Sequence, residues 1–256
     1  MDREKYKGRS AIVTGAGQGT GRIGATIARR LAEGGARMLV ADLDSKVSRT
    51  AEEIREATGS EVIHFTGDLS QEVTVVEMVE QAKSRFGRID ILVNNAGGGV
   101  IRPFLEHTAE TLKQTLDRNL WTTIWCCHKV LPHMIAQKYG RIVNIGGDSV
   151  RNGLFDHAAY NAAKGGVHGM TTGLAREFAS YDITVNTVAP CVVRTERHLA
   201  ALRDNPALVE RFINVVPKGR GAELEEIASY VDYLAGQEAA FVTGQVVSIN
   251  GGSTML

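Results

Sequence analysis

The chain has 256 residues, 43% of them hydrophobic and 23% charged, which suits one large α/β domain or two small ones. Lys and Arg together number 29, as do Asp and Glu, and this neutrality argues against nucleic acid or an anionic membrane as the main partner. Three cysteines, a charged amino terminus and the lack of any apolar run of membrane-spanning length predict no disulfide framework, no signal peptide, no membrane span and a cytoplasmic location.

Strand-like apolar runs alternate with helical patterns along the chain. Strands are predicted at 10–15, 37–44, 61–70, 89–98, 141–147 and 183–190, and helices at 25–36, 46–59, 73–87, 111–140 and 158–181. Such alternation indicates βαβ units, and strands that are apolar on both faces are covered by helices on both sides. We therefore predict an α/β fold, a single Rossmann domain over residues 1–256 with a doubly wound parallel sheet. An irregular, charged stretch at about 191–222 is predicted to be a lid.

A glycine-rich loop joins the first predicted strand to the first helix. The segment "TGAGQGTGRIGAT" (14–26) carries Gly15, Gly17, Gly19, Gly21 and Gly24. Glycine lets the backbone approach a pyrophosphate, and the amino terminus of the following helix offers free N–H groups to the anion. In this strand–loop–helix context the segment predicts a dinucleotide site.

An acidic residue ends the second predicted strand. Asp42 follows Gly24 by 18 residues, where a carboxylate accepts hydrogen bonds from the adenosine ribose hydroxyls. The same carboxylate repels a 2′-phosphate. The predicted cofactor is therefore NAD in preference to NADP.

A set of motifs in this order resembles the short-chain dehydrogenase/reductase superfamily over essentially the whole chain. The motifs are "TGAGQGTG", the acid of "VADLD", "GDL" at 67–69, "NNAG" at 94–97, Asn119 in "DRNL", "YNAAK" at 160–164, and "VAP" followed by Thr195. The resemblance implies an enzyme that interconverts a secondary alcohol and a ketone, and a homotetramer or dimer. The cofactor-binding residues that it implies are Gly15, Gln18, Gly21, Ile23, Gly24, Asp42, Leu43, Asp68, Leu69, Asn94, Ala96, Gly97, Tyr160, Lys164, Pro190, Val193 and Thr195.

The glycine-rich loop is three residues longer than the family pattern. Helix residues such as Ile27 normally follow the last glycine three positions sooner, so the insertion adds nearly one helical turn. We interpret Gly15 as the first turn and Gly24 as the contact between helix and strand, with Gln18 and Ile23 along the cofactor. Gly17 is then the dispensable glycine.

Tyr160 and Lys164 are the predicted catalytic pair. At a spacing of four residues they share one helix face. The ammonium, helped by the positive nicotinamide of the oxidised cofactor, can then stabilise the phenolate and lower the tyrosine pKa from about 10. The resemblance assigns Tyr160 to exchange the hydroxyl proton and Lys164 to bond the nicotinamide ribose. It assigns Asn119 to hold a water that joins Lys164 to solvent.

The fourth catalytic residue is displaced. The family serine that steadies the substrate oxygen lies 13 residues before the tyrosine, and here that position is Gly147. The nearest hydroxyl is Ser149. Either the Gly146–Gly147 pair lets the loop bulge and brings Ser149 inward, or another donor serves the oxyanion. We favour Ser149.

The substrate is only weakly indicated by the sequence. Arg102, Arg151 and Arg194 border the predicted active-site mouth and are candidates for holding a carboxylate or an acyl-CoA phosphate. The tail "TGQVVSINGGSTML" is similar to that of dehydrogenases for alicyclic 2-hydroxyacyl-CoA substrates. The alternatives are an NADPH-dependent 3-oxoacyl-carrier-protein reductase and a non-catalytic NAD-binding sensor. The histidines show no metal-site spacing, so no metal is predicted.

Overall fold

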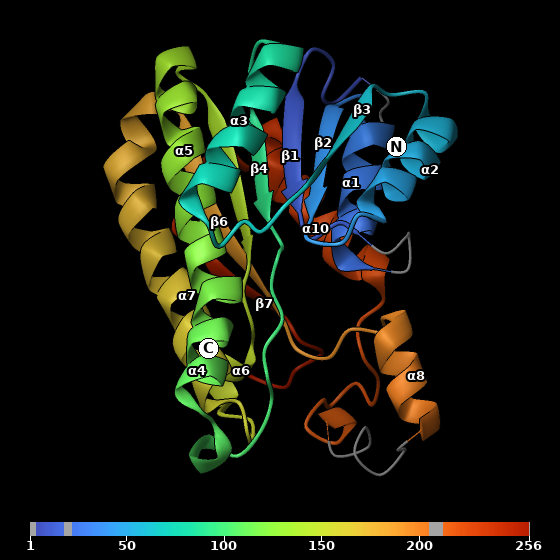
Figure 1. Cartoon of the computed structure of the whole chain (residues 1–256), viewed down its shortest axis with the longest axis vertical. Coiled ribbons are helices and arrows are strands. Elements are labelled where there is room, and N and C mark those ends of the chain that lie inside the picture. The colour runs from blue at the N-terminus through green and yellow to red at the C-terminus, as the bar shows by residue number, and fades with distance from the viewer. Residues whose placement is uncertain (1–3, 18–21, 205–211, 256) are drawn as a thin grey trace.

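The computed structural model describes residues 4–17, 22–204 and 212–255 (Figure 1). Within these ranges seven strands form one sheet in the order β3-β2-β1-β4-β5-β6-β7, and all neighbouring strands are parallel. The strands are β1 (Ser10–Thr14), β2 (Arg37–Asp42), β3 (Val62–Thr66), β4 (Ile91–Asn94), β5 (Gly140–Ile145), β6 (Ile183–Pro190) and β7 (Val246–Ile249). This arrangement confirms the predicted α/β Rossmann fold with a doubly wound parallel sheet.

Helices cover both faces of the sheet. The α-helices are α1 (Ile23–Glu33), α2 (Val47–Thr58), α3 (Glu72–Phe86), α4 (Ala109–Leu116), α5 (Thr122–Gln137), α6 (Ser149–Asn152), α7 (Ala158–Phe178), α8 (Glu196–Asp204) and α10 (Leu224–Ala235). Short 3-10 turns lie at Phe104–Glu106, Ala179–Tyr181 and Gln237–Ala239, and a π-helical turn lies at Asp117–Trp121. One core cluster joins the sheet to α1, α2 and α10, and another joins it to α3, α5 and α7. No helix in the described ranges is long and apolar enough to cross a membrane.

The strand β1 illustrates how the sequence produces these two cores. Ala11 and Val13 contribute to the core beneath α1, whereas Ile12 between them contributes to the core on the opposite face. Successive residues of a strand point to opposite sides, so a strand covered on both sides must be apolar throughout. Full burial of a side chain such as Ile12 contributes roughly 1.5–3 kcal/mol.

The structure differs from the predicted elements in three places. The helix expected over 111–140 is interrupted by the π-helical turn. β7 and α10 were not predicted. β7 is only four residues long and half-buried throughout, so its apolar pattern is too short to indicate a strand. The predicted lid contains α8. The two ends of the lid segment are joined, because the Arg194 N–H donates to the carbonyl of Ala222 at 2.8 Å.

The sheet order creates a crevice at its carboxyl edge. β1 lies between β2 and β4, so the chain leaves β1 toward one half of the sheet and enters the other half at β4. In open α/β sheets ligands bind where the strand order reverses in this way. The loops that follow these strands therefore meet at one place.

Candidate active site

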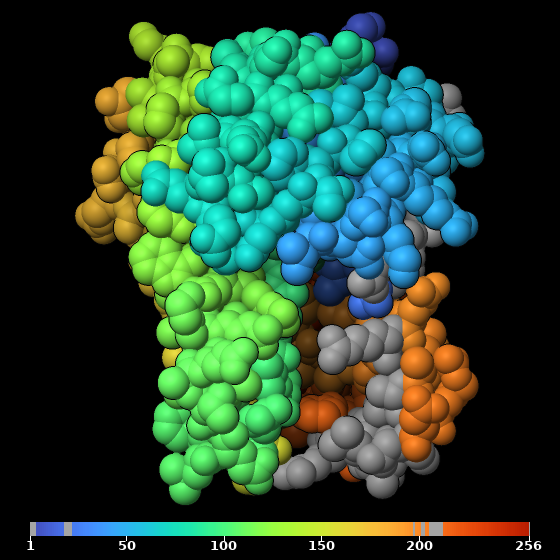
Figure 2. All heavy atoms as spheres, viewed as in Figure 1, coloured from blue at the N-terminus to red at the C-terminus, as the bar shows by residue number. Residues whose placement is uncertain are grey.

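A cavity of about 710 Å³ lies at the carboxyl edge of the sheet. The molecule is hollowed on this side between the green side chains of α4 and the orange side chains of α8 (Figure 2). A cavity of this size suits a cofactor or another small organic ligand. The predicted site residues that line it are Gly15, Ile23, Asp42, Leu43, Asp68, Leu69, Ala96, Gly97, Asn119, Tyr160, Lys164 and Thr195.

The remaining predicted site residues lie elsewhere. Gln18 and Gly21 lie outside the described residues. The Asn94 side chain is buried, where it donates to Asn144 Oδ1 at 2.9 Å. Pro190 ends β6 in the core, and Val193 pairs with Ala222 across the base of the lid segment. Gly24 and Ser149 are buried beside the cavity lining.

Gly15 and Gly24 have the packing that the loop interpretation requires. Gly15 has a φ of +66°, and a Cβ there would lie 2.7 Å from the Ala96 Cα. A Cβ on Gly24 would collide with the carbonyl oxygen of Gly15. Both positions need glycine because backbone occupies the space of a side chain. Together they bring the amino terminus of α1 against the end of β1, where a cofactor phosphate can approach.

Gly17 is not dispensable, and this part of the sequence interpretation is wrong. Its N–H donates to Asp42 Oδ2 at 2.7 Å, and the Asp44 N–H donates to the other Asp42 oxygen at 3.0 Å. A Cβ on Gly17 would lie 2.6 Å from the Asp42 Cγ. The glycine therefore allows the loop to hold the carboxylate in one orientation at the end of β2.

Several cavity residues were missed by the sequence analysis. Asn95 fastens the loops after β1 and β4 together, because its Nδ2 donates to the carbonyls of Thr14 and Gly15 at 3.0 and 2.8 Å. It is the second asparagine of "NNAG", so the motif itself contained the signal. The lining residues that were missed are Gly17, Arg22, Gly67, Asn95, Gly98, Arg118, Thr122, Ile145 and Gly146.

Tyr160 and Lys164 face the cavity from the first turns of α7. The Lys164 Nζ lies 5.8 Å from the centre of the Tyr160 ring and donates to the carbonyl of Ile145 at 2.7 Å. Burial raises the pKa of Tyr160 to about 12 and lowers the pKa of Lys164 to about 8. Without the cofactor, burial therefore shifts the Tyr160 pKa upward, and the predicted lowering needs the positive charge of the oxidised nicotinamide as well as Lys164.

Asn119 lies in the π-helical turn between α4 and α5. It is fully buried, and its Oδ1 accepts from the Gly98 N–H at 3.1 Å. Its Nδ2 donates to the carbonyls of Thr115 and Gly98 at 2.9 and 3.2 Å. Single π-helical turns inside helices are frequent at functional sites. Here the wide turn places the Asn119 amide against the loop after β4 and close to Lys164. A Cβ on Gly97, in that loop, would lie 2.7 Å from Asn119 Oδ1 and 3.4 Å from Lys164 Nζ.

Gly147 occupies the position at which a side chain would face the Tyr160 hydroxyl. An ideal Cβ there would lie 3.4 Å from the Tyr160 hydroxyl oxygen and 3.6 Å from Ser149 Oγ. Ser149 begins the short helix α6, is 5% exposed and donates to Asn161 Oδ1 at 2.6 Å. The Ser149 hydroxyl therefore borders the space that Gly147 leaves open.

Two of the three candidate arginines bond to the protein itself. Arg151 donates to Ser248 Oγ and to the Val246 carbonyl, both at 2.8 Å. Arg194 forms an ion pair of 2.6 Å with Glu223. Arg102 is half-buried, and its guanidinium lies 3.5 Å from the carbonyl of Glu106. In the described part of the chain no three His, Cys, Asp or Glu side chains are grouped to hold a metal ion.

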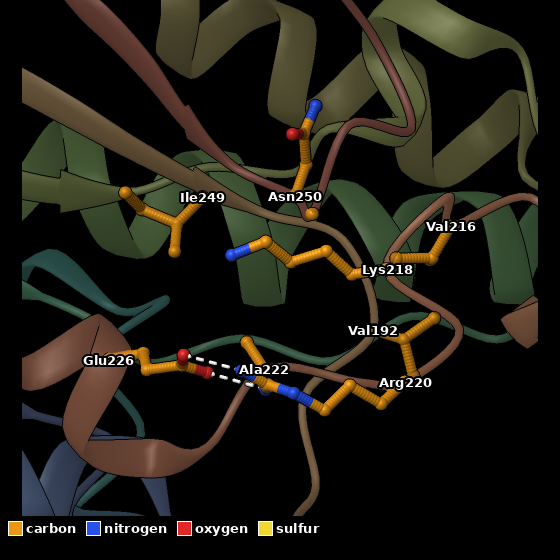
Figure 3. Close-up of a pocket in the computed structure, with 9 residues that line it drawn as sticks. Val192, Val216, Lys218, Arg220, Ala222, Glu226, Ile249 and Asn250 are labelled. Atoms are coloured by element: carbon orange, nitrogen blue, oxygen red, sulfur yellow. Dashed lines mark hydrogen bonds and ion pairs between the residues drawn. The ribbon is translucent and has the colours of Figure 1, made fainter.

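A smaller pocket of about 100 Å³ lies between the base of the lid segment and the end of β7 (Figure 3). Arg220 forms two hydrogen bonds of 2.8 Å with the Glu226 carboxylate on one side of it. The Lys218 side chain extends across the pocket toward Ile249 (Figure 3). None of the residues predicted as catalytic lines this pocket.

The fold and the larger cavity together define a class of protein. A doubly wound sheet with a glycine-rich first loop, a strand-end acid and a Tyr–Lys pair in one cavity is typical of oxidoreductases that bind a nicotinamide dinucleotide. A family model described as enoyl-(acyl carrier protein) reductase matches residues 15–254. The chain belongs to the short-chain dehydrogenase/reductase family and is an oxidoreductase that uses a nicotinamide cofactor.

Two similar proteins are named as dehydrogenases of dihydroxylated compounds, and a third as a reductase. A 2,3-dihydroxy-2,3-dihydro-p-cumate dehydrogenase of Pseudomonas putida is 57% identical over 251 residues, which cover 98% of this chain and 96% of that one. A 1,6-dihydroxycyclohexa-2,4-diene-1-carboxylate dehydrogenase of Acinetobacter baylyi is 32% identical, with 97% of each chain covered. The crystal structure of levodione reductase matches with a TM-score of 0.88 at 32% identity, over 96% of this chain and 98% of that one.

Proposed function

We propose that the chain oxidises a cyclic vicinal diol, a dihydrodiol, with NAD as the cofactor. The observation that carries this proposal is the 57% identity, over nearly the whole chain, to a dehydrogenase of a ring that bears hydroxyls on neighbouring carbons. The A. baylyi relative is likewise named for a ring with neighbouring hydroxyls. A cyclic diol is favoured over an acyl-CoA, since Arg151 and Arg194, two of the three arginines considered for a CoA phosphate, are bonded within the protein.

The proposed reaction uses Tyr160 as the base. The phenolate oxygen takes the proton of one substrate hydroxyl while the carbon that bears this hydroxyl loses hydride and becomes a carbonyl. When bound in the cavity, oxidised nicotinamide would supply the hydride acceptor and a positive charge that favours the phenolate. Lys164 positions the cofactor ribose, and Asn119 holds the loop after β4 beside Lys164. The product is a hydroxyketone on the ring, and it tautomerises to an aromatic diol when a proton shifts from carbon to oxygen.

Asp42 supports NAD over NADP in this proposal. Its carboxylate is held at the end of β2 by two backbone N–H groups and lines the cavity. A charged carboxylate accepts hydrogen bonds from ribose hydroxyls and repels a 2′-phosphate. This feature disfavours the NADPH-dependent 3-oxoacyl-carrier-protein reductase.

Gly17→Ala is expected to raise the KM for NAD roughly tenfold, which corresponds to about 1.4 kcal/mol of cofactor binding. The added methyl group would displace the Asp42 carboxylate that the Gly17 N–H now orients. Steady-state kinetics with varied NAD measures the effect. Gly173→Ala is the control because Gly173 is exposed on α7, has no left-handed φ and has nothing within 4 Å of an ideal Cβ. An unchanged KM in Gly17→Ala would show that the orientation of Asp42 does not depend on this glycine.

The proposed activity is tested directly with the purified protein. Incubated with NAD and cis-2,3-dihydroxy-2,3-dihydro-p-cumate, it is expected to produce NADH, measured as absorbance at 340 nm. Replacement of the diol by a straight-chain acyl-carrier-protein substrate with NADPH is expected to give at most 1% of that rate by order of magnitude. Faster turnover of the acyl substrate would overturn the proposed function.

We also propose a cytoplasmic enzyme that assembles as a homotetramer or dimer, with a lid at 191–222. The three cysteines are free, as in a reducing compartment. Trp121 is 42% exposed and stacks on Trp125. The apolar surface that it presents supports association of subunits. The charged composition of the 191–222 segment and the hydrogen bond between its ends, from the Arg194 N–H to the Ala222 carbonyl, support a lid.

A further inference from the structure

We propose that the space beside Gly147 binds the second hydroxyl of a vicinal diol, and that Ser149 is its hydrogen-bonding partner. This inference rests on the proposed function and names the feature of the substrate that the site recognises. It assigns Gly147 and Ser149 to specificity for two neighbouring oxygens. Tyr160 remains the partner of the oxygen that reacts.

The first step of the argument is the missing side chain. A side chain on Gly147 would project toward Tyr160, with its Cβ 3.1 Å from a ring carbon and 3.4 Å from the hydroxyl oxygen. A Cβ at 3.1 Å from another carbon is a crowded contact. With glycine, no side chain stands between this loop and the Tyr160 hydroxyl, so a substrate atom next to the reacting oxygen can approach the loop there.

The second step is the polarity of that space. The point at which the Gly147 Cβ would lie is 3.6 Å from Ser149 Oγ, so the space is bordered by the hydroxyls of Ser149 and Tyr160. Ser149 is almost fully buried and donates its proton to Asn161 Oδ1 at 2.6 Å. Its oxygen therefore keeps lone pairs to accept a hydrogen bond from a substrate hydroxyl. A ketone or a single alcohol supplies no second hydroxyl to use them.

The third step is the support of the loop. Asp148, between the two residues, is fully buried, and its carboxylate accepts hydrogen bonds from Ser248, Asn250, Ser253 and Thr254. Burial alone would raise the pKa of Asp148, but these hydrogen bonds outweigh it and hold the pKa below its usual value. The ionised carboxylate thus fastens the carboxyl-terminal segment to the loop. Gly147 and Ser149 are held in place on either side of it.

These contacts define the class of ligand. The neighbouring oxygens of a cis diol on a ring lie about as far apart as two hydrogen-bonded oxygens, roughly 2.7–2.8 Å. One oxygen can therefore meet the Tyr160 hydroxyl while the other enters the space beside Gly147. A serine at 147 would fill this space and supply its own hydroxyl to the reacting oxygen. With glycine at 147, the second hydroxyl of the substrate occupies the place that a serine hydroxyl would take.

The kinetic test compares cis-1,2-cyclohexanediol with cyclohexanol as substrates of the full chain with NAD. In Gly147→Ser the ratio of kcat/KM for the diol to kcat/KM for the monoalcohol is expected to fall about tenfold, and in Ser149→Ala about fivefold. Ser149→Thr, which retains a hydroxyl, is expected to restore part of the ratio. Ser84→Ala, an exposed serine on α3, is the matched control. Equal loss for both substrates in Gly147→Ser and Ser149→Ala would overturn the inference.

A binding test separates this inference from the proposed function. Calorimetry on the NADH-bound protein compares catechol with phenol, and the preference for catechol is expected to fall about fivefold in Ser149→Ala. Should the wild type fail to oxidise the p-cumate dihydrodiol, the proposed function fails, and the catechol preference still decides the inference. Equal affinity for catechol and phenol in the wild type would reject it. Thermal melting of each variant verifies that it is folded.

Discussion

Tyr160→Phe is expected to lower kcat by about 10³–10⁴-fold while the Kd for NADH changes less than about threefold. The substitution removes the oxygen that we propose exchanges the substrate proton, and it leaves the ring that packs at the start of α7. Burial raises the pKa of this tyrosine to about 12, so the phenol loses its proton near neutral pH only with help from positive charge in the occupied site. Stopped-flow or steady-state kinetics with the diol, beside fluorescence titration with NADH, measures both quantities.

The control for this variant is Tyr181→Phe. Tyr181 lies after α7, is 39% exposed and is absent from the cavity lining. It is expected to keep the wild-type kcat. If Tyr160→Phe retained most of its turnover, another group would have to accept the proton, and the proposed mechanism would be wrong. Loss of NADH binding in Tyr160→Phe would instead indicate a role in building the cofactor site.

Asp42→Ala is expected to lower the ratio of kcat/KM with NAD to kcat/KM with NADP about 10²-fold. In the proposed site the carboxylate would affect both terms of this ratio, because it would accept hydrogen bonds from the ribose hydroxyls of NAD and repel the 2′-phosphate of NADP. A hydrogen bond to a charged group contributes about 1.5–3 kcal/mol, which supports a change of this size. Initial rates with each cofactor at saturating diol measure the ratio.

The matched control removes a similar charge from the neighbouring helix. Glu52 is exposed on α2, so Glu52→Ala lowers the negative charge near the adenosine end without touching the cavity lining. Its cofactor ratio is expected to stay within about twofold of the wild type, because exposed charges are screened by salt. An equal change in both variants would attribute the preference to the net charge of the region. Equal or tighter binding of NADP by the wild type would contradict the assignment of NAD.

The sequence alone determined the features that depend on near neighbours in the chain. Strand and helix alternation predicted the doubly wound sheet, because apolar periodicity is a local property. Tyr160 and Lys164 were predicted on one helix face from their spacing of four residues, and both line the cavity. Gly15 was predicted at the first turn, where it has a φ of +66°.

Contacts between distant parts of the chain decided the rest. Gly17 was judged dispensable because its contact, the Asp42 carboxylate, lies 25 residues away and is reached only when β2 pairs with β1. The burial that raises the Tyr160 pKa in the absence of the cofactor also depends on the whole fold, so residue spacing could not reveal it.

The loop around Gly147 shows the same division most fully. Spacing alone revealed that serine is missing from its usual place. Only the folded chain brings Ser248 and its neighbours, 100 or more residues away, onto Asp148, and only that contact holds Ser149 beside the space at Gly147. Spacing along the chain identifies residues that one helix or turn brings together. The shape and polarity of a cavity depend on side chains that meet across the sheet, and tertiary packing decides them.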